Sequence, residues 1–372
     1  DLSDSDITPA CPIPWRIYLR QLYGGRQEGV FMLVVDNGHQ LVRLIPTRGM
    51  GILDVQSKTL RLGWDSPVQE VTHPNSINLE SRGGTGWLEG FNEYLVRCGL
   101  EWCGPPAEDD HHLAKAEPPV GRTTLHGKIA NIPASELSVE IETKSPWRIR
   151  VHSMVREAMM YGPKFQLKST FETRPGESGF SVTDTVANLG GQTQEFQLLY
   201  HLNHGVPLLE AGSRWLAPLK WSAPRDAESA KGLKSMDKFD KPKSGSLEKA
   251  FLCQLHADRR GQTGVVLQNE AADRGVHISW PQKALPCFTV WKAEHPPADG
   301  YVCGLEPGTN YPLPRPVERE AGRVQKIKAG GEWSARLQFD SLEDRTAVAQ
   351  ANKIIRAIAK GKKADAQKEP VL

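Results

Sequence analysis

A glutamate followed directly by proline and glycine lies late in the chain, at 306–308, after an apolar run at 287–291. Proline and glycine do not continue a regular strand ladder, so the backbone is expected to turn there and to leave Glu306 at a strand end. Rigid strand ends commonly hold catalytic side chains. A surface turn with an incidental acid is the alternative, because short motifs also match by chance.

Two histidine segments precede this glutamate. His126 lies in Thr-Leu-His-Gly-Lys at 124–128, and His201 lies in Leu-Tyr-His-Leu-Asn-His-Gly at 199–205. Each histidine follows an apolar or β-favouring run and precedes a glycine within a few residues. Two imidazoles and one carboxylate are a natural set for acid–base catalysis near neutral pH.

In order and local context these residues resemble the galactose mutarotase-like (aldose 1-epimerase) superfamily, and more narrowly its DUF4432 branch of bacterial aldose-epimerase-like proteins. The resemblance runs from Gly24 to Phe339 and includes an Arg-Gly turn at 48–49 and the pattern Asp-x-Val-x-Asn-Leu-Gly at 184–190. The second histidine segment departs from the family's His-x-Tyr-Phe-Asn. A different sugar or a different reaction is therefore left open.

The resemblance implies a sugar isomerase that exchanges anomers through the open-chain form. This reaction requires a base for the anomeric hydroxyl and an acid for the ring oxygen. The resemblance assigns the base to Glu306, the acid to His201 and the orientation of the substrate to His126. No cofactor is expected. A carbohydrate-binding protein without turnover, and a lyase or isomerase acting on an oxidised sugar with or without a metal, are the alternatives.

Other polar and aromatic residues are expected to contact the sugar. A glycine-rich loop at 82–87 lacks the Lys-Ser/Thr of a P-loop and the context of a dinucleotide site, so we interpret it as a sugar-lining loop. The substrate-binding candidates are Arg82, Trp87, Asn203, His204, Asn310 and Arg315. Core packing of Trp87 and capping of a strand end by His204 are the alternatives. The resemblance also implies an aspartate after the second histidine, and Asp237 and Asp240 are not distinguished.

Metal binding has two candidate sets. His111 and His112 lie beside three carboxylates, but adjacent side chains diverge and a charged, proline-bounded segment is typical of a solvated loop. His126, His201 and Glu306, with His204, would be adequate ligands for a transition metal, although their spacing does not require one. We therefore expect no metal site.

Strands must position these residues. Alternation over 138–188 predicts four strands, and an earlier hairpin turns at 36–38. The pattern predicts an all-β fold, a β-supersandwich of two large, mostly antiparallel sheets, as one domain over 1–340. The resemblance implies that this supersandwich is galactose mutarotase-like. Arg48 is expected to form a structural salt bridge beneath the sheet. Helical spacing then predicts an amphipathic helix over 341–360, capped by Ser341, and a disordered tail over 361–372.

Composition limits the partners. The 372 residues include 46 basic and 44 acidic side chains, so the net charge of +2 gives no reason to expect nucleic acid or an anionic membrane. The six scattered cysteines form no CxxC pair, and no apolar run approaches the roughly 20 residues of a membrane span. The beginning of the chain shows no secretion signal. The sequence predicts a cytoplasmic monomer or homodimer whose partner is a small sugar.

Overall fold

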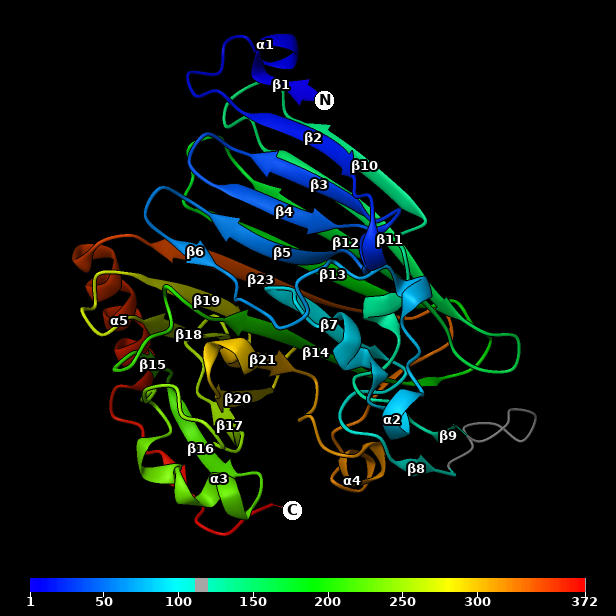
Figure 1. Cartoon of the computed structure of the whole chain (residues 1–372), viewed down its shortest axis with the longest axis vertical. Coiled ribbons are helices and arrows are strands. Elements are labelled where there is room, and N and C mark those ends of the chain that lie inside the picture. Colours follow the sequence, from blue (N-terminus) through cyan, green and yellow to red (C-terminus); the bar gives the residue numbers. More distant parts are fainter. Residues whose placement is uncertain (111–119, 372) are drawn as a thin grey trace.

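Two large sheets packed face to face form the frame of the molecule in the computed structural model, which describes residues 1–110 and 120–371 (Figure 1). Within those residues the larger sheet has 14 strands and the smaller one has eight. Apart from the parallel pair β16–β24, the described strand pairs are antiparallel, as the hydrophobic alternation predicts. The β-supersandwich predicted from the sequence is confirmed.

The larger sheet runs, in order, through β1 (Leu2–Ser3), β2 (Arg16–Gln21), β3 (Phe31–Asp36), β4 (Leu41–Ile45), β5 (Gly51–Gln56), β7 (Leu95–Leu100), β14 (Gln194–His204), β21 (Tyr301–Gly308), β20 (Cys287–Glu294), β17 (Lys249–Leu255), β16 (Leu219–Pro224) and β24 (Asp365–Ala366). Two further strands lie off this path: β6 (Arg61–Leu62) pairs with β5, and β22 (Gln325–Ile327) pairs with β14.

The smaller sheet runs through β10 (Glu136–Ile141), β11 (Ile149–Ala158), β12 (Lys164–Thr173), β13 (Gly179–Asn188), β23 (Glu332–Leu342), β19 (Gly275–Pro281), β18 (Gln262–Gln268) and β15 (Arg214–Leu216). A separate short pair joins β8 (Glu108–Asp109) to β9 (Gly121–Arg122). The α-helices are α1 (Asp4–Ile7), α2 (Ser81–Gly84), α3 (Ala227–Lys231), α4 (Arg315–Glu320) and α5 (Arg345–Ala359).

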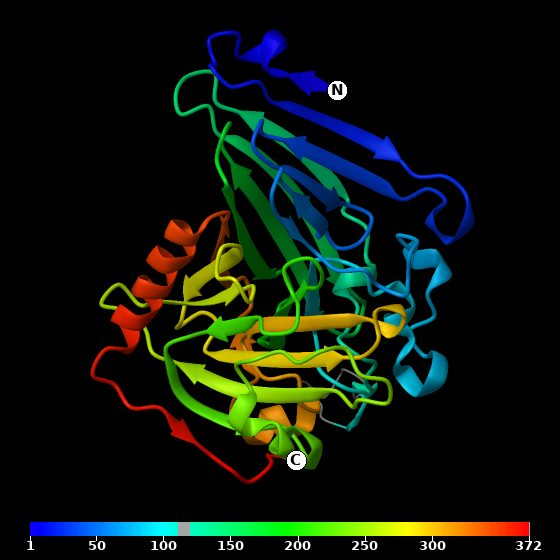
Figure 2. The same cartoon turned by 60° about the vertical axis from the view of Figure 1, so that its left-hand side comes forward.

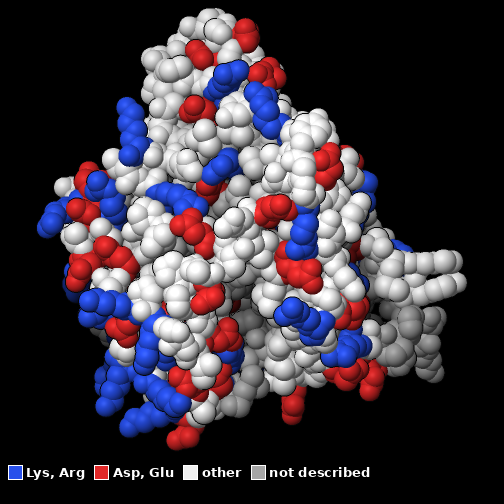
Figure 3. Space-filling view, in the orientation of Figure 1, with Lys and Arg blue, Asp and Glu red and all other residues white. Residues whose placement is uncertain are grey.

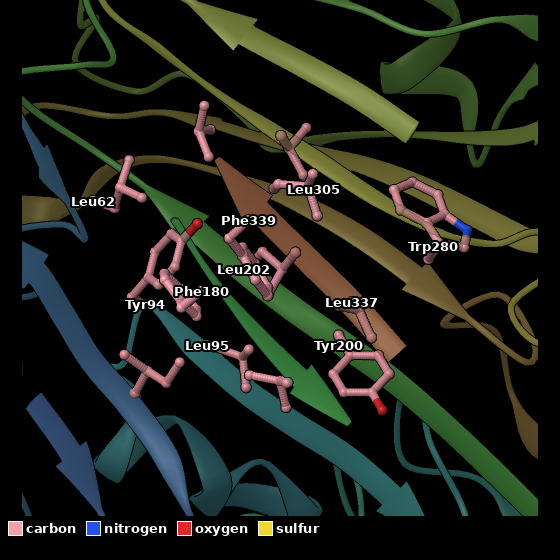
Figure 4. Packing of buried hydrophobic residues seen from close by; sticks show 14 of the residues in the cluster. Leu62, Tyr94, Leu95, Phe180, Tyr200, Leu202, Trp280, Leu305, Leu337 and Phe339 are labelled. Atoms are coloured by element: carbon pink, nitrogen blue, oxygen red, sulfur yellow. The ribbon is translucent and has the colours of Figure 1, made fainter. Parts of the chain in front are cut away.

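The main hydrophobic core lies between the two sheets. Leu202 and Leu305 reach it from the larger sheet, and Phe180 and Phe339 reach it from the smaller one (Figure 4). The last two rings stack with centroids 4.6 Å apart. Because side chains alternate along a strand, the neighbours of these residues in β14 and β21 point to the opposite face of the larger sheet.

A buried ion pair also joins the sheets. Arg97 on β7 contacts both carboxylate oxygens of Asp184 on β13, at 2.6 and 3.0 Å, and Tyr200 donates its hydroxyl to the same carboxylate at 2.8 Å. A second buried pair, predicted as a structural salt bridge, joins Arg48 to Glu93 at 2.6 Å.

The C-terminal helix begins later than predicted. Ser341 belongs to β23 and pairs with Val276, so the strand continues to Leu342 and Asp344 caps the helix, accepting from the amide of Ala347 at 2.8 Å. Val348 and Ile355 pack this helix onto the smaller sheet (Figure 2). The segment beyond 360, predicted to be disordered, pairs Asp365 and Ala366 with β16.

The surface carries interspersed charges. On the face shown in Figure 3, basic and acidic side chains alternate without a large field of either sign, in keeping with the net charge of +2. No helix in the described part of the chain is long and apolar enough to cross a membrane.

Candidate active site

A cavity of about 730 Å³ lies on the face of the larger sheet that points away from the smaller sheet. Alternation along β14 sends Tyr200 and Leu202 into the core between the sheets and His201 to the cavity face. Glu306 of β21 and His126, in the connection between β9 and β10, line the same cavity. The three residues with acid–base chemistry therefore meet, although they lie far apart in the sequence.

His201 and Glu306 are opposite each other on neighbouring strands. The register that pairs Leu199 with Gly308 and Leu202 with Leu305 places these two side chains side by side. Their Nε2 and Oε1 atoms lie 3.1 Å apart, and both side chains are almost fully buried. The strand continues through Pro307 to Gly308, so the turn predicted directly after Glu306 is wrong.

Pro307 is opposite Phe288 of β20, and on the side of β14 it lies between the paired positions Leu305 and Gly308. A proline, which has no N–H to donate, is tolerated at such an interruption of the pairing. The proline signal in the sequence therefore marks a local weakness of the strand rather than its end. Gly304, two residues before Glu306, leaves room for the pair, since a Cβ there would lie 2.5 Å from Glu306 Oε1 and 2.9 Å from His201 Cε1.

Burial sets the protonation of the pair. Removal from water lowers the pKa of His201 to about 4, against a smaller opposing effect of its hydrogen bond to Asn203. Removal from water also raises the pKa of Glu306 to about 8. At neutral pH His201 is therefore a neutral imidazole and Glu306 is protonated, so the pair carries one transferable proton, located on Glu306.

His126 is held in an uncommon backbone conformation. Its φ is +58°, in the left-handed region that non-glycine residues seldom adopt. Its amide donates to Gly104 at 2.8 Å, its carbonyl accepts from Gly99 at 3.0 Å, and the next residue, Gly127, has no space for a Cβ beside Gly99 and Trp102. Burial, with the neighbouring His201, lowers the pKa of His126 to about 3, so this imidazole is neutral.

Aromatic rings form much of the wall. Phe91 and Trp291 lie edge-on to the His201 ring, with centroids 5.1 and 5.4 Å away, and Trp87 lies 4.8 Å from the ring of His126. Trp64 completes this group of lining aromatics. The sequence allows Trp87 to be either a stacking platform or core packing. The structure shows that it lines the cavity and is buried in the cluster around it, and its stacking on a sugar stays a prediction.

Charged residues lie toward the more exposed part of the lining. Glu248 accepts from the Trp291 indole and from Arg225, both at 2.7 Å. Arg225 also contacts Asp226 at 2.8 Å. Asp299 lines the cavity as well, whereas Asp237 and Asp240, the two aspartates suggested by the sequence, are not among its lining residues.

Five of the six substrate-binding candidates lie outside the cavity lining. Arg82 is exposed on the loop beside it. His204 packs edge-on against Tyr94, with ring centroids 5.1 Å apart, on the opposite face of β14 from His201. Burial lowers its pKa to about 3. The sequence prediction that this residue joins the site is wrong, because an offset of three residues along a strand reverses the side-chain direction.

Asn310 and Arg315, two further substrate-binding candidates, make contacts within the protein and do not line the cavity. The Asn310 amide donates to the carbonyl of Tyr311 at 2.7 Å. Arg315 is buried between Asp109 at 3.0 Å and Glu195 at 3.1 Å. Asn203 lies behind His201, with its Oδ1 2.6 Å from His201 Nδ1. It therefore supports the catalytic candidate and is not among the residues that line the cavity.

Sequence reasoning missed Thr289 and Trp291 on β20. Thr289 pairs directly with Glu306, and Trp291 pairs with Gly304, so both point to the cavity face. The alternation in Cys-Phe-Thr-Val-Trp at 287–291 carries this signal, but only once the hairpin partner of the strand is known. No group of three or more potential metal ligands is found in the described part of the chain. His111 and His112 lie outside the described residues.

Comparison with known proteins identifies the family. The family model of a domain of unknown function, DUF4432, matches residues 27–340. The chain belongs to the DUF4432 family. No curated protein matches it.

Solved structures resemble this DUF4432 protein over most of its length. A candidate aldose 1-epimerase from Klebsiella pneumoniae is 35% identical with a TM-score of 0.94, covering 100% of this chain and 94% of its own. A galactose mutarotase-like protein from Clostridium acetobutylicum is 15% identical with a TM-score of 0.58, covering 87% of this chain and 98% of its own. Galactose 1-epimerase from Lactobacillus acidophilus is 9% identical with a TM-score of 0.58, covering 88% and 99%. The last two likenesses establish the fold alone.

Proposed function

We propose that this DUF4432 protein interconverts the anomers of a free sugar by acid–base catalysis. The observation that carries the proposal is the buried His201–Glu306 contact of 3.1 Å, which lines a cavity of about 730 Å³. A cavity of this size is in the range of small-molecule sites, roughly 300–1,000 Å³. The resemblance to aldose 1-epimerase folds supports the same class of reaction.

The pair matches what mutarotation demands. Ring opening breaks the bond between the anomeric carbon and the ring oxygen, takes the proton from the anomeric hydroxyl and gives a proton to the ring oxygen. One member of the pair gives the proton that it holds, and the other takes one, so the pair ends with the same number of protons. Rotation about the single bond between the carbonyl carbon and the next carbon turns the other carbonyl face toward the hydroxyl, and reversal of both proton transfers closes the ring as the other anomer.

The resemblance gives the base role to Glu306, and the pKa directions place the resting proton on it. The reaction requires that the pair carry one transferable proton, whichever of the two side chains holds it. If this proton moves from Glu306 to His201 across the 3.1 Å contact, the acid and base roles are exchanged. His126, neutral and 5.7 Å from His201 between ring centroids, is proposed to orient the substrate.

The lining favours an uncharged sugar. Among the described residues that line this cavity, Arg225 is the one Lys or Arg, and its guanidinium is already held by Asp226 and Glu248. Glu248 and Asp299 add negative charge nearby, which opposes a phosphate or carboxylate group. The aromatic walls suit the C–H faces of a pyranose ring.

Anomer exchange followed by NMR tests the proposal. A panel pairs each free hexose and deoxyhexose with its phosphorylated counterpart, and protein is added at catalytic concentration. We expect accelerated exchange for at least one uncharged sugar and less acceleration for its phosphate. Binding of a sugar without accelerated exchange would instead support the carbohydrate-binding alternative. Faster exchange of the phosphorylated sugars would contradict the assigned substrate class.

A further inference from the structure

The amide of Asn203 has a defined orientation behind the candidate catalytic pair. Its Nδ2 donates to the carbonyl oxygen of Glu93 at 2.9 Å and to that of His201 at 3.4 Å. Carbonyl oxygens only accept hydrogen bonds, so the NH₂ group must face them. The Oδ1 atom is therefore the one that contacts His201 Nδ1, at 2.6 Å.

This orientation decides the tautomer of His201. Because Oδ1 of Asn203 only accepts, Nδ1 of the imidazole must carry a hydrogen. A neutral imidazole carries a single hydrogen, so its Nε2 has a free lone pair. Nε2 faces Glu306 Oε1 at 3.1 Å, and the hydrogen in that contact is then the one transferable proton of the pair.

A rigid frame holds the amide in place. The carboxylate of Glu93 pairs with Arg48 at 2.6 Å, and both side chains are fully buried. Arg48 also donates to Asn131 at 2.9 Å. The carbonyl of Glu93 that receives the Asn203 amide also receives the indole N–H of Trp64 at 3.2 Å. The orientation of Asn203 is therefore supported by several elements around the cavity.

We propose that Asn203 is a positioning residue, which fixes His201 as the Nδ1–H tautomer so that the His201–Glu306 pair carries one transferable proton and one site that accepts a proton. The sequence suggested a substrate contact for Asn203 instead. Its Oδ1 and Nδ2 are committed to His201 and Glu93, and the side chain is absent from the cavity lining. Only the kinetic part of this inference rests on the proposed function.

The tautomer is measured directly on the wild-type protein. Imidazole nitrogen NMR on histidine-labelled protein, with the His201 signals assigned by their loss in His201→Asn, distinguishes a protonated Nδ1 from a protonated Nε2. We expect the Nδ1–H form near neutral pH. An Nε2–H form would overturn the inference, whether or not any sugar is turned over.

Two variants test the kinetic consequence. Asn203→Leu removes the acceptor, and we expect kcat to fall about 10²-fold with little change in KM, because the imidazole loses its orientation. Asn203→Asp places a carboxylate beside Nδ1, which favours the imidazolium. We expect the acidic limb of the pH–rate profile to move upward by about one unit or more.

A matched control separates positioning from stability. Asn188 also donates its amide to backbone carbonyls, those of Gln192, Ile327 and Lys328, at a distant position of the fold. Asn188→Asp loses comparable hydrogen bonds and should lower the melting temperature without moving the acidic limb. An Asn203→Asp profile that loses amplitude but keeps its acidic limb would mean that Asn203 is merely structural.

Discussion

At the scale of single residues, His201 and Glu306 lie on the same face of the sheet, and both side chains are almost completely shielded from water. Burial disfavours the charged form of both groups, and it therefore shifts their pKa values in opposite directions, to about 4 and about 8. Separated values of this kind are characteristic of acid–base partners in active sites. The same separation makes two predictions about pH.

The first prediction is a broad plateau of activity. Below about pH 4 His201 takes up a second proton, and above about pH 8 Glu306 loses the first, so the one-proton pair prevails between these limits. We expect kcat/KM for anomer exchange to be nearly constant inside this window and to fall on both sides. A maximum confined to alkaline pH would contradict this protonation scheme.

The second prediction concerns stability and requires no substrate. The pKa of Glu306 is raised in the folded protein, so its favourable contribution is complete below the unfolded pKa and is lost as the pH rises toward about 8. Relative to wild type, Glu306→Gln should gain on the order of 1 kcal/mol of unfolding free energy per pH unit between about pH 4.5 and about pH 8, and no more above that.

Urea unfolding of both proteins at several pH values measures this difference. His126 and His204 are expected to titrate alike in the two proteins and so largely cancel, whereas His201, which contacts Glu306 at 3.1 Å, is followed through its own titration below pH 5. A difference between the variants that stays constant with pH would mean that Glu306 is ionised in the folded state.

At the scale of elements, two strands and a glycine bring the pair together. The β14–β21 register sets His201 opposite Glu306, and Gly304 keeps the space beside them free of a side chain. The alternation of side chains along a strand could be read from the sequence. It assigns His201 and Asn203 to one face of the strand and His204 to the other, so the wrong placement of His204 in the site was avoidable. The register itself was not available, because it depends on pairing between strands about 100 residues apart.

Gly304→Ala tests the importance of this close approach. The new Cβ would lie 2.5 Å from Glu306 Oε1 and 2.9 Å from His201 Cε1, and one of the two side chains must move. We expect a loss of about 10²-fold or more in kcat, since displacements near 1 Å have effects of that order. Gly191→Ala is the control, because a Cβ at that position would meet no atom within 4 Å. Equal activity of both variants would show that the pair tolerates displacement.

At the scale of the whole molecule, the two sheets enclose one core and leave the cavity on the outer face of the larger sheet. Period-two alternation predicts both sheets, because it follows from burial of one strand face. The segments that supply Trp64, Glu248 and Asp299 carry no motif, and only the folded chain brings them to the cavity. Arg48, by contrast, was predicted as a structural ion pair, and this prediction is confirmed.

The Arg97–Asp184 pair connects the two sheets and should be important for stability. Asp184→Asn leaves the guanidinium of Arg97 buried without its carboxylate, and loss of one partner in such a pair costs about 3–5 kcal/mol. Asp237→Asn removes an exposed pair with Arg214 and should cost less than about 1 kcal/mol. Denaturant unfolding of both variants tests the contrast. Similar small losses would mean that the interface does not depend on this pair.

The central claim is that Glu306 and His201 transfer protons to and from a bound sugar. Anomer exchange by NMR, with affinity measured separately, compares wild-type protein with Glu306→Gln for the sugar that the wild type turns over. The amide keeps the size of the carboxylate but transfers no proton, so we predict a loss of roughly 10²–10⁴-fold in kcat with nearly unchanged affinity. A Glu306→Gln variant that exchanges anomers at the wild-type rate would contradict the account.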